Sequence, residues 1–374
     1  MSAQSSLNSD AADIRVMLVE DSAVVRGMVR KWLDSVPDVQ VVGSADNGQK
    51  AIDLVGAARP DIIVLDIEMP VMDGLTALPG ILRKVPQAKV IISSTLSRKN
   101  AEVTLRAMSL GASDYITKPS FTRDGQDARS LFKEELVRKV VGLAQAARPT
   151  SSVRGEQNTQ WSPIPAANAR FKFRKASSIQ PRVLVIGAST GGPAALTKVF
   201  EDLKPQLGTV PVLVTQHMPP TFTALLGEKL AQLSGLKGGE AVAGELVVAG
   251  RLYVAPGGKH MRIAKGSGGL VIDLDDGPPI NHCKPAVDPL FESVAGHFGN
   301  SALAAILTGM GADGAAGSVE IADAGGTVYA QDEASSVVWG MPGATALAGA
   351  CTAIVDLDKM GERLGRALHG GVSL

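Results

Sequence analysis

The first 143 residues repeat one pattern five times: a short run of β-branched and aliphatic residues, then roughly 10 to 15 residues with helical spacing. The five runs lie at residues 16–19, 39–42, 62–65, 90–92 and 115–116. Strands that alternate with helices pair in parallel, because each helix returns the chain to the same end of the sheet. The pattern predicts an α/β fold with a doubly wound (βα)5 sheet over residues 14–143.

A polar segment interrupts this pattern at residues 144–180. It is rich in Pro, Ser, Asn and Gln and carries several Arg and Lys residues, with no helical or strand period. Such composition is typical of a flexible tether, and we predict a flexible basic linker here. A basic linker can also contact an acidic surface, but a linker that is simply solvated is favoured.

A second strand and helix pattern fills residues 181–374. Apolar runs recur at residues 182–186, 210–215, 302–308, 328–331 and 353–356. Two glycine-rich segments of alternating polarity, 250–255 and 261–274, read as hairpin-like. We predict a C-terminal doubly wound α/β domain with a β-hairpin insertion.

The composition argues against several classes of protein. There are 37 Lys and Arg against 37 Asp and Glu, so the formal net charge is zero. This balance disfavours a nucleic-acid partner bound by broad phosphate neutralisation. No apolar run approaches the roughly 20 residues that cross a bilayer, and the first 13 residues lack a signal-peptide core. With only two cysteines, we expect a cytoplasmic protein without membrane insertion.

Acidic residues follow two of the first domain's predicted strands. Glu20 and Asp21 end the first strand, Asp66 the third, Ser93 the fourth and Lys118 the fifth. The carboxyl ends of parallel strands share one edge, so three carboxylates converge there and favour a Mg²⁺ ion. A carboxylate beside Mg²⁺ and a lysine suits phosphoryl transfer, with Asp66 as the acceptor. Ser94 and Thr95 directly follow Ser93, so the sequence identifies the hydroxyl residue of this cluster only to within a residue.

The second domain has a candidate nucleophile. A Gly-x-Ser-x-Gly motif places Ser189 between a strand and a helix, in the form of a nucleophile elbow. His217 ends the next strand and Asp313 follows the buried-looking strand at 302–308. We predict a triad in which His217 takes the serine proton and Asp313 orients the imidazole. Backbone N–H groups near Thr190 and Met310 are the candidate oxyanion donors.

The second domain offers alternatives to this triad. The glycine-rich turn fits a dinucleotide site poorly, because its second glycine is replaced by serine and no ribose-binding acid ends the next strand. His260, His282 and His297 are rivals for the base, but none follows a parallel strand directly. Asp288 is the rival acid, although Val-Asp-Pro at 287–289 is equally suited to cap a helix.

The first domain resembles the receiver domain of bacterial two-component response regulators. The matching motifs are Val-Glu-Asp-Ser at 19–22, Asp-Ile-Glu-Met-Pro-Val-Met-Asp-Gly at 66–74 and Thr-Lys-Pro at 117–119. The resemblance implies that Asp66 is phosphorylated from a histidine kinase. It also implies that Ser93 hydrogen-bonds the phosphoryl group and that Tyr115 is the aromatic that moves on activation.

The second domain resembles the catalytic domain of chemotaxis protein-glutamate methylesterases. The matching motifs are Ile-Gly-Ala-Ser-Thr-Gly-Gly at 186–192, Gln-His-Met-Pro-Pro at 216–220, Ala-Pro-Gly at 255–257, Leu-Thr-Gly-Met-Gly at 307–311 and Asp-Gly-Ala-Ala-Gly at 313–317. This implies phosphorylation-activated hydrolysis of glutamate γ-methyl esters on chemoreceptor helices, with deamidation of receptor glutamines. No cofactor is implied for ester hydrolysis.

Some positions depart from the family pattern. Ala312 stands where the family has Asn, Gly258 where it has Asp, and Cys-Lys-Pro-Ala at 283–286 where it has His-Arg-Pro-Ser. Two other functions stay open: a response regulator whose second domain only binds a partner, and a small-molecule serine esterase. The chain joins a phosphoryl-acceptor site to a hydrolase site. This arrangement suggests the hypothesis that the unphosphorylated receiver covers the Ser189 cleft.

Overall fold

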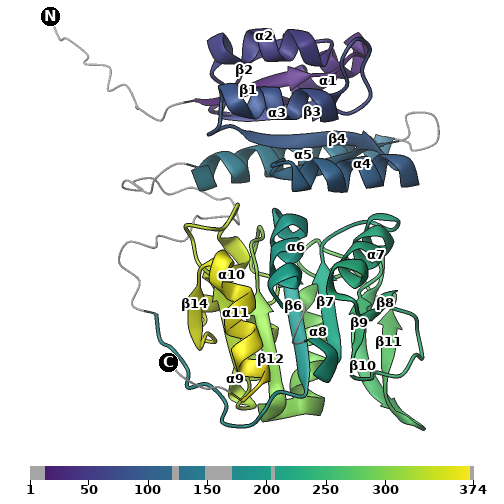
Figure 1. Cartoon of the computed structure of the whole chain (residues 1–374). Helices are drawn as coiled ribbons and strands as arrows, with labels where there is room; N and C mark the ends of the chain where they lie inside the picture. The colour runs from purple at the N-terminus through teal and green to yellow at the C-terminus, as the bar shows by residue number, and fades with distance from the viewer. Residues whose placement is uncertain (1–12, 120–125, 148–170, 204–206, 371–374) are drawn as a thin grey trace, which may run out of the picture. The chain divides into compact units, whose positions relative to one another are not determined.

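A computed structural model describes residues 13–119, 126–147, 171–203 and 207–370. Two compact units make up the chain, one on a five-stranded sheet and one on a seven-stranded sheet (Figure 1). Across these described ranges, no helix combines the length and the apolar character that crossing a membrane requires.

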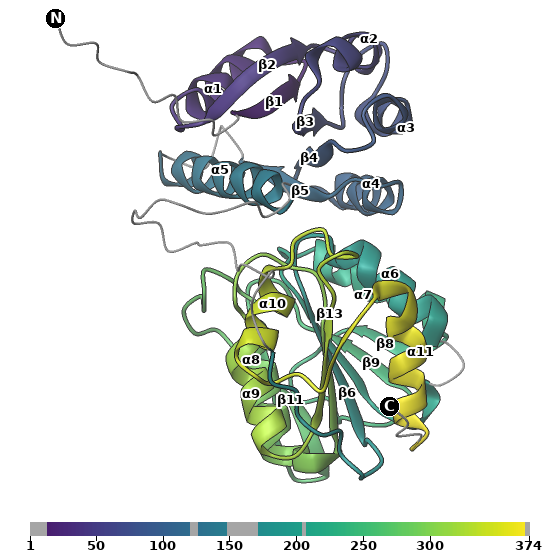
Figure 2. The same cartoon turned by 90° about the vertical axis from the view of Figure 1, so that its left-hand side faces the viewer.

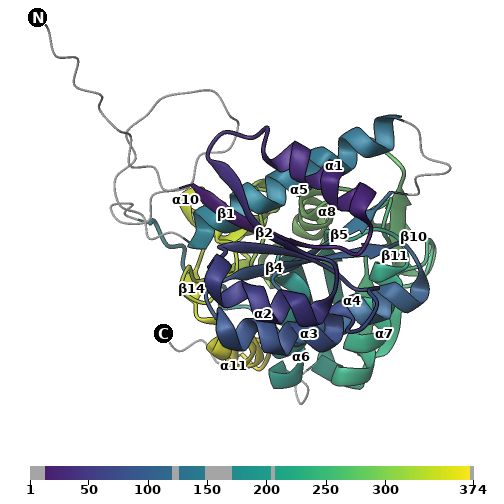
Figure 3. The same ribbon diagram turned by 90° about the horizontal axis from the view of Figure 1, so that it is seen from above.

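The N-terminal sheet is fully parallel, with strand order β2-β1-β3-β4-β5. Its strands are β1 (Ile14–Val19), β2 (Val39–Ala45), β3 (Ile62–Asp66), β4 (Lys89–Thr95) and β5 (Asp114–Lys118). The connecting helices are α1 (Ala23–Leu33), α2 (Gly48–Ala58), α3 (Gly74–Lys84), α4 (Arg98–Ser109) and α5 (Gln126–Ala147). Figure 3 shows α1 and α5 on one face of the sheet, with α2 and α3 on the other. The predicted (βα)5 architecture is confirmed.

The C-terminal sheet is also parallel, in the order β14-β13-β12-β6-β7-β9-β8. Its strands are β6 (Val183–Ala188), β7 (Val212–Gln216), β8 (Lys237–Glu240), β9 (Arg251–Val254), β12 (Ala302–Ile306), β13 (Thr327–Gln331) and β14 (Ala353–Val355). Figure 2 shows α6 (Gly192–Leu203), α7 (Phe222–Ser234) and α11 (Leu357–Leu368) on one face. The other face carries α8 (Val287–Phe298), α9 (Ala315–Asp323) and α10 (Gly340–Leu347).

The predicted β-hairpin insertion is present, but one of its segments is assigned differently. β10 (His260–Gly266) and β11 (Gly269–Asp275) pair antiparallel in a two-stranded sheet. The segment 250–255, expected to be hairpin-like, instead contains β9, which pairs in parallel with β7 and β8. Its residues Leu252, Tyr253 and Val254 are all buried, as is typical of a strand covered on both faces.

The ends of the predicted linker have regular contacts. Helix α5 continues to Ala147, past the predicted linker start at 144. On the other side, the Arg174 N–H donates to the Cys351 carbonyl oxygen and the Ser177 N–H donates to Thr327 Oγ1. Most of the predicted linker lies outside the described residues.

Strand β6 is the first strand of the C-terminal sheet along the chain and lies between β12 and β7. The helix after β6 packs on one face of the sheet, while the helix after β12 packs on the other. Such a point, where the winding direction changes, leaves a crevice at the carboxyl ends of the strands. The three predicted triad residues follow β6, β7 and β12, which are neighbouring strands at this point of the sheet.

Candidate active site

Ser189 occupies a tight turn between β6 and α6. Its N–H donates to the carbonyl oxygen of Thr308 over 3.0 Å, and the Gly192 N–H donates to the Ser189 carbonyl oxygen over 2.7 Å. Gly191 has a φ of +78°, a conformation that L side chains adopt rarely, and a Cβ there would lie 2.6 Å from Val337. The glycine therefore permits a turn that leaves the serine side chain half-buried rather than enclosed.

His217 links the other two predicted triad residues. Its Nδ1 lies 3.1 Å from Ser189 Oγ, and its Nε2 lies 2.7 Å from Asp313 Oδ2. Its backbone N–H donates to the Ala188 carbonyl oxygen over 3.2 Å, which fixes the end of β7 beside the end of β6. With Nε2–H donated to the carboxylate, Nδ1 presents its lone pair to the serine hydroxyl.

Asp313 is held as an ion by backbone donors at the start of α8. Its Oδ2 accepts the Val287 N–H over 2.6 Å and its Oδ1 accepts the Asp288 N–H over 3.1 Å. Burial opposes ionisation, but the hydrogen bond to His217 and these two N–H groups outweigh it and lower the pKa of Asp313. The carboxylate is 1% exposed, so its orientation toward the imidazole is fixed.

Two residues that sequence reasoning gave no role contact the triad. Gln216 Nε2 donates to the carbonyl oxygen of Ser189 over 2.9 Å. Cys283 Sγ lies 3.2 Å from His217 Nδ1. The position of Gln216 directly before His217 at a strand end was an available signal, whereas nothing in the spacing of Cys283 pointed to the imidazole.

The imidazole is a stronger base than an ordinary histidine. Burial lowers the pKa of His217, but the Cys283 sulfur and the Asp313 carboxylate outweigh it and raise that pKa to about 10. The Asp313 carboxylate facing Nε2 favours the imidazolium, the form that accepting the serine proton creates.

The rival residues occupy other environments. His260 is buried and bonded at both nitrogens to backbone groups, accepting from the Ala286 N–H and reaching the Pro278 carbonyl oxygen. His282 and His297 are exposed. Asp288 Oδ1 accepts the Gly317 N–H over 2.8 Å, and its burial, with the nearby Asp313, raises its pKa to about 7.

The residues proposed to flank the oxyanion are both buried at the edge of this site. Thr190 is 5% exposed and its carbonyl oxygen accepts the Thr308 hydroxyl over 2.9 Å. Met310 is 6% exposed and follows the glycine whose N–H pairs with the Val338 carbonyl oxygen. The role of their backbone N–H groups as oxyanion donors remains a prediction.

The N-terminal unit brings together its own predicted cluster. Carboxylate oxygens of Glu20, Asp21 and Asp66 all lie within 4.8 Å of one another. Lys118 Nζ lies 2.7 Å from Glu20 Oε2 and 2.8 Å from Asp66 Oδ2. Three carboxylates with hard oxygen donors, one of them exposed at Asp21, fit the ligand preference of Mg²⁺.

Without a metal, this cluster is electrostatically unfavourable. Burial of Asp66 raises its pKa to about 6, with Glu20 and Asp21 adding to the rise and Lys118 opposing it. The same arrangement raises the pKa of Lys118, because Asp66 and Glu20 outweigh the effect of its burial. A divalent cation would relieve the repulsion among the carboxylates.

The predicted supporting residues lie in neighbouring strands. Ser93 pairs in register with Asp66 and is 4% exposed, whereas the residue at 95 is exposed. Tyr115 is buried in β5, where burial raises the pKa of its phenol well above the ordinary value.

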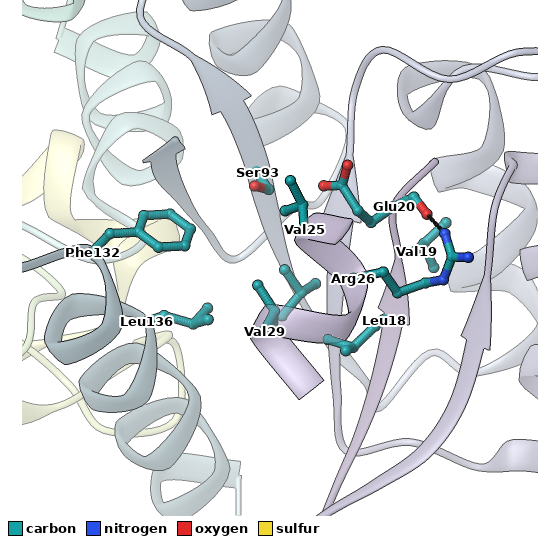
Figure 4. Close-up of a pocket in the computed structure, with 10 residues that line it drawn as sticks. Leu18, Val19, Glu20, Val25, Arg26, Val29, Ser93, Phe132 and Leu136 are labelled. Atoms are coloured by element: carbon teal, nitrogen blue, oxygen red, sulfur yellow. Dashed lines mark hydrogen bonds between the residues drawn. The ribbon is translucent and has the colours of Figure 1, made fainter. Parts of the chain in front are cut away.

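A small pocket adjoins this cluster (Figure 4). Its lining comes from β1, α1, β3, β4 and α5: Leu18, Val19, Glu20, Val25, Arg26, Val29, Val64, Ser93, Phe132 and Leu136. Seven of these ten side chains are apolar, so the pocket gives Glu20 and Ser93 an apolar wall on this side. Such a wall limits the water available to Glu20 on this side of the cluster.

Comparisons with known proteins give a match for each of the two units. A family model described as CheB methylesterase matches residues 184–364, and one described as response regulator receiver domain matches residues 16–128. A protein-glutamate methylesterase/protein-glutamine glutaminase of group 2 operon from Rhodopseudomonas palustris is 47% identical over 96% of this chain and 95% of its own length. A relative from Azospirillum brasilense named protein-glutamate methylesterase/protein-glutamine glutaminase is 48% identical, over 93% of this chain and 91% of its own.

Among solved structures, the CheB methylesterase catalytic domain of Thermotoga maritima is 37% identical, with a TM-score of 0.48. That match covers 50% of this chain and 99% of the solved domain. The identity of the curated relatives extends over nearly the whole sequence, so the receiver and the hydrolase-like half are matched together. The chain belongs to the CheB methylesterase family, as a member with an N-terminal response regulator receiver domain.

Proposed function

We propose that this protein is a serine hydrolase that removes methyl esters from glutamate side chains of chemoreceptors and deamidates specific receptor glutamines. The observation that carries the proposal is the continuous chain of contacts from Ser189 Oγ through His217 to Asp313, at 3.1 and 2.7 Å. These distances match a nucleophile, a base and an orienting acid.

Each triad residue has one role in this reaction. His217 Nδ1 takes the proton from Ser189 as Oγ attacks the ester carbonyl carbon, and the imidazolium then protonates the departing methoxide. Methanol leaves and a glutamyl ester remains on the serine. Water, deprotonated by His217, attacks that ester and restores both the serine hydroxyl and the receptor carboxylate.

Deamidation follows the same steps with ammonia as the leaving group. The amide needs a protonated nitrogen to leave, so it depends more strongly on the imidazolium as acid. The lowered pKa of Asp313 and the raised pKa of His217 favour that charged pair. Backbone N–H groups near Thr190 and Met310 are placed by this proposal at the oxyanion of both reactions.

The receiver supplies the control. Asp66 accepts a phosphoryl group from a histidine kinase, and Mg²⁺ held by Glu20, Asp21 and Asp66 supplies charge neutralisation for that transfer. Lys118 and Ser93 contact the phosphoryl oxygens, and Tyr115 repositions on activation. Phosphorylation of Asp66 raises the rate of ester hydrolysis.

The cellular compartment of the reaction follows from the location of its partners. Chemoreceptor helices and a histidine kinase meet in the cytoplasm, so the enzyme acts there on one and is phosphorylated by the other. The balance of 37 Lys and Arg against 37 Asp and Glu disfavours a nucleic-acid partner bound by broad phosphate neutralisation.

A comparison of wild type with Ser189→Ala tests this function. With methylated receptor membranes as substrate, wild type releases methanol and Ser189→Ala does not. Retained receptor binding without methanol release by wild type would indicate a binding module instead. Faster cleavage of a generic small ester than of the receptor ester would indicate a small-molecule esterase.

A further inference from the structure

Cys283 and Ser189 compete for one atom of the catalytic imidazole. Cys283 Sγ lies 3.2 Å from His217 Nδ1, and Ser189 Oγ lies 3.1 Å from the same nitrogen. The other ring nitrogen is already bonded to Asp313. A neutral imidazole has a single lone pair for a donor, so one partner at a time can bond to Nδ1.

The backbone holds the cysteine in this position. The Cys283 N–H donates to the Ile280 carbonyl oxygen over 2.8 Å, and the Ile280 N–H donates back over 3.1 Å. Between them, Asn281 and His282 have φ values of 51° and 62°, which close a two-residue turn. The thiol therefore projects from a short hydrogen-bonded loop with a defined direction.

A buried histidine anchors both sides of that loop. His260, 1% exposed, accepts the Ala286 N–H over 3.1 Å and contacts the Pro278 carbonyl oxygen over 3.0 Å. These two bonds hold the chain two residues before and three residues after the turn at 280–283. The approach of Cys283 to the imidazole is thus built into the fold around it.

The two competing groups differ greatly in acidity. A thiol ordinarily ionises near pH 8.5 and much more readily than an alcohol such as serine. A proton that moves from Sγ to Nδ1 leaves a thiolate beside an imidazolium. In that state Nδ1 has no lone pair, and His217 is unable to accept the Ser189 proton.

The charges around the imidazole favour this pair. Among the described residues, the ionisable groups acting on His217 are Cys283 at Nδ1 and Asp313 at Nε2, with Asp288 behind Asp313. Lys284, next to Cys283, directs its ammonium to Asp276. Burial lowers the pKa of His217, but Cys283 and Asp313 together bring it to about 10.

We propose that Cys283 restrains this enzyme by giving its proton to His217 Nδ1 and thereby withholding that nitrogen from Ser189. Hydrolysis begins only when the proton returns to Sγ and the lone pair becomes available to the serine. The proposal rests on the triad function given above.

Two substitutions test the restraint on catalysis. Cys283→Ala removes the competing acid, and Cys283→Ser keeps the size while replacing the thiol by a far weaker acid. We expect both to raise kcat on the plateau near pH 8 by roughly 3- to 10-fold with KM unchanged, and to move the acidic limb of the pH profile up by about one unit, because the thiolate and imidazolium pair of wild type already forms when the enzyme loses one proton. Cys351→Ala, at the chain's other cysteine, is the control and keeps the wild-type profile.

Thiol reactivity gives a readout that does not depend on hydrolysis. Iodoacetamide alkylates a thiolate by forming an S–C bond as iodide leaves, and the modified peptide is counted by mass spectrometry. Cys351 is 1% exposed, so Cys283 is the cysteine we expect to react. Because a free thiol is only about 1% ionised at pH 6.5, His217→Ala should slow alkylation at least roughly tenfold. Ser189→Ala should not slow it.

The outcomes separate this proposal from the proposed function. Equal alkylation rates in wild type and His217→Ala, or lower activity in both Cys283 variants, would overturn the role of Cys283. An unshifted acidic limb in those variants would overturn it as well. Fast, His217-dependent alkylation in a protein that releases no methanol would instead support the thiol and imidazole pair while contradicting the esterase function.

Discussion

Gln216 Nε2 donates a hydrogen bond of 2.9 Å to the carbonyl oxygen of Ser189, across 27 residues of sequence. The glutamine is 1% exposed and directly precedes the catalytic base. One side chain at the end of β7 therefore ties the turn that carries the nucleophile to the strand that carries its proton acceptor. The distance between Ser189 and His217 depends on this tie as well as on the pairing of β6 with β7.

Gln216→Met tests that relationship. Methionine fills a similar volume but has no N–H donor, so the Ser189 carbonyl oxygen loses a buried partner at a cost of about 1–3 kcal/mol in stability. We expect kcat for methanol release to fall roughly tenfold with KM nearly unchanged, because positioning of the nucleophile is lost. Gln232→Met, on an exposed position of α7, is the matched control. Wild-type kcat in Gln216→Met would show that the tie has no catalytic role.

Gly192→Ala should disturb the same contact from the other side. A Cβ at position 192 would lie 2.0 Å from Gln216 Oε1 and 2.9 Å from the Ala188 side chain. The glutamine amide must move, so we expect a loss of about 1–3 kcal/mol in the free energy of unfolding and a fall in kcat. Gly208→Ala, where a Cβ meets nothing within 4 Å, should leave both unchanged. Unfolding curves and initial rates for the two variants make the comparison.

The sequence predicted the parts of the site that follow from strand order. Residues at the carboxyl ends of parallel strands share an edge, so Ser189, His217 and Asp313 could be placed together from their positions alone. The same reasoning brought Glu20, Asp21, Asp66 and Lys118 into one cluster. The alternation of strands and helices in both domains, and the β-hairpin insertion in the second, were likewise predictable from periodicity.

Contacts made by loops and by long-range packing could not be predicted this way. Cys283 reaches His217 through the turn at 280–283, and no sequence period encodes where that loop lies. The glycine content and alternating polarity of segment 250–255 predict a hairpin-like element, yet the segment contains a buried strand that pairs in parallel with β7 and β8. The pairing of Asp313 with the N–H groups of α8 also depends on tertiary packing.

Asp313→Asn should nearly abolish hydrolysis. The single amide oxygen can accept only one of the two α8 N–H groups, and the side chain no longer stabilises the imidazolium or fixes its tautomer. We expect kcat to fall by about 10³–10⁴-fold, while binding of the methylated receptor is retained. Asp288→Asn is the comparison, because Asp288 does not contact His217, and its loss of activity should be far smaller. Equal losses in the two variants would contradict the assigned acid.

The receiver should show a pH dependence that belongs to Asp66. Its pKa is raised from 3.8 to about 6 in the folded chain, so the folded state holds a proton there that the unfolded state has released. That stabilisation is present at low pH and is lost as pH rises through the window from 3.8 to 6. Relative to Asp66→Asn, wild type should lose up to about 3 kcal/mol across that window without metal.

Mg²⁺ should offset part of this loss. A cation that binds the folded cluster at ten times its dissociation constant stabilises the fold by about 1.4 kcal/mol. The melting temperature of the receiver transition at pH 7.5 should therefore rise with Mg²⁺ in wild type and rise much less in Asp66→Asn. An equal rise in both proteins would indicate that the metal binds elsewhere.

Methanol release from methylated receptor membranes, measured with and without a small phosphoryl donor such as acetyl phosphate, tests the central claim most directly. The account predicts that the donor raises the rate of wild type, leaves the rate of Asp66→Asn at its basal value, and produces no methanol from Ser189→Ala in either condition. Methanol release by Ser189→Ala at the wild-type rate, or equal stimulation of Asp66→Asn, would contradict it.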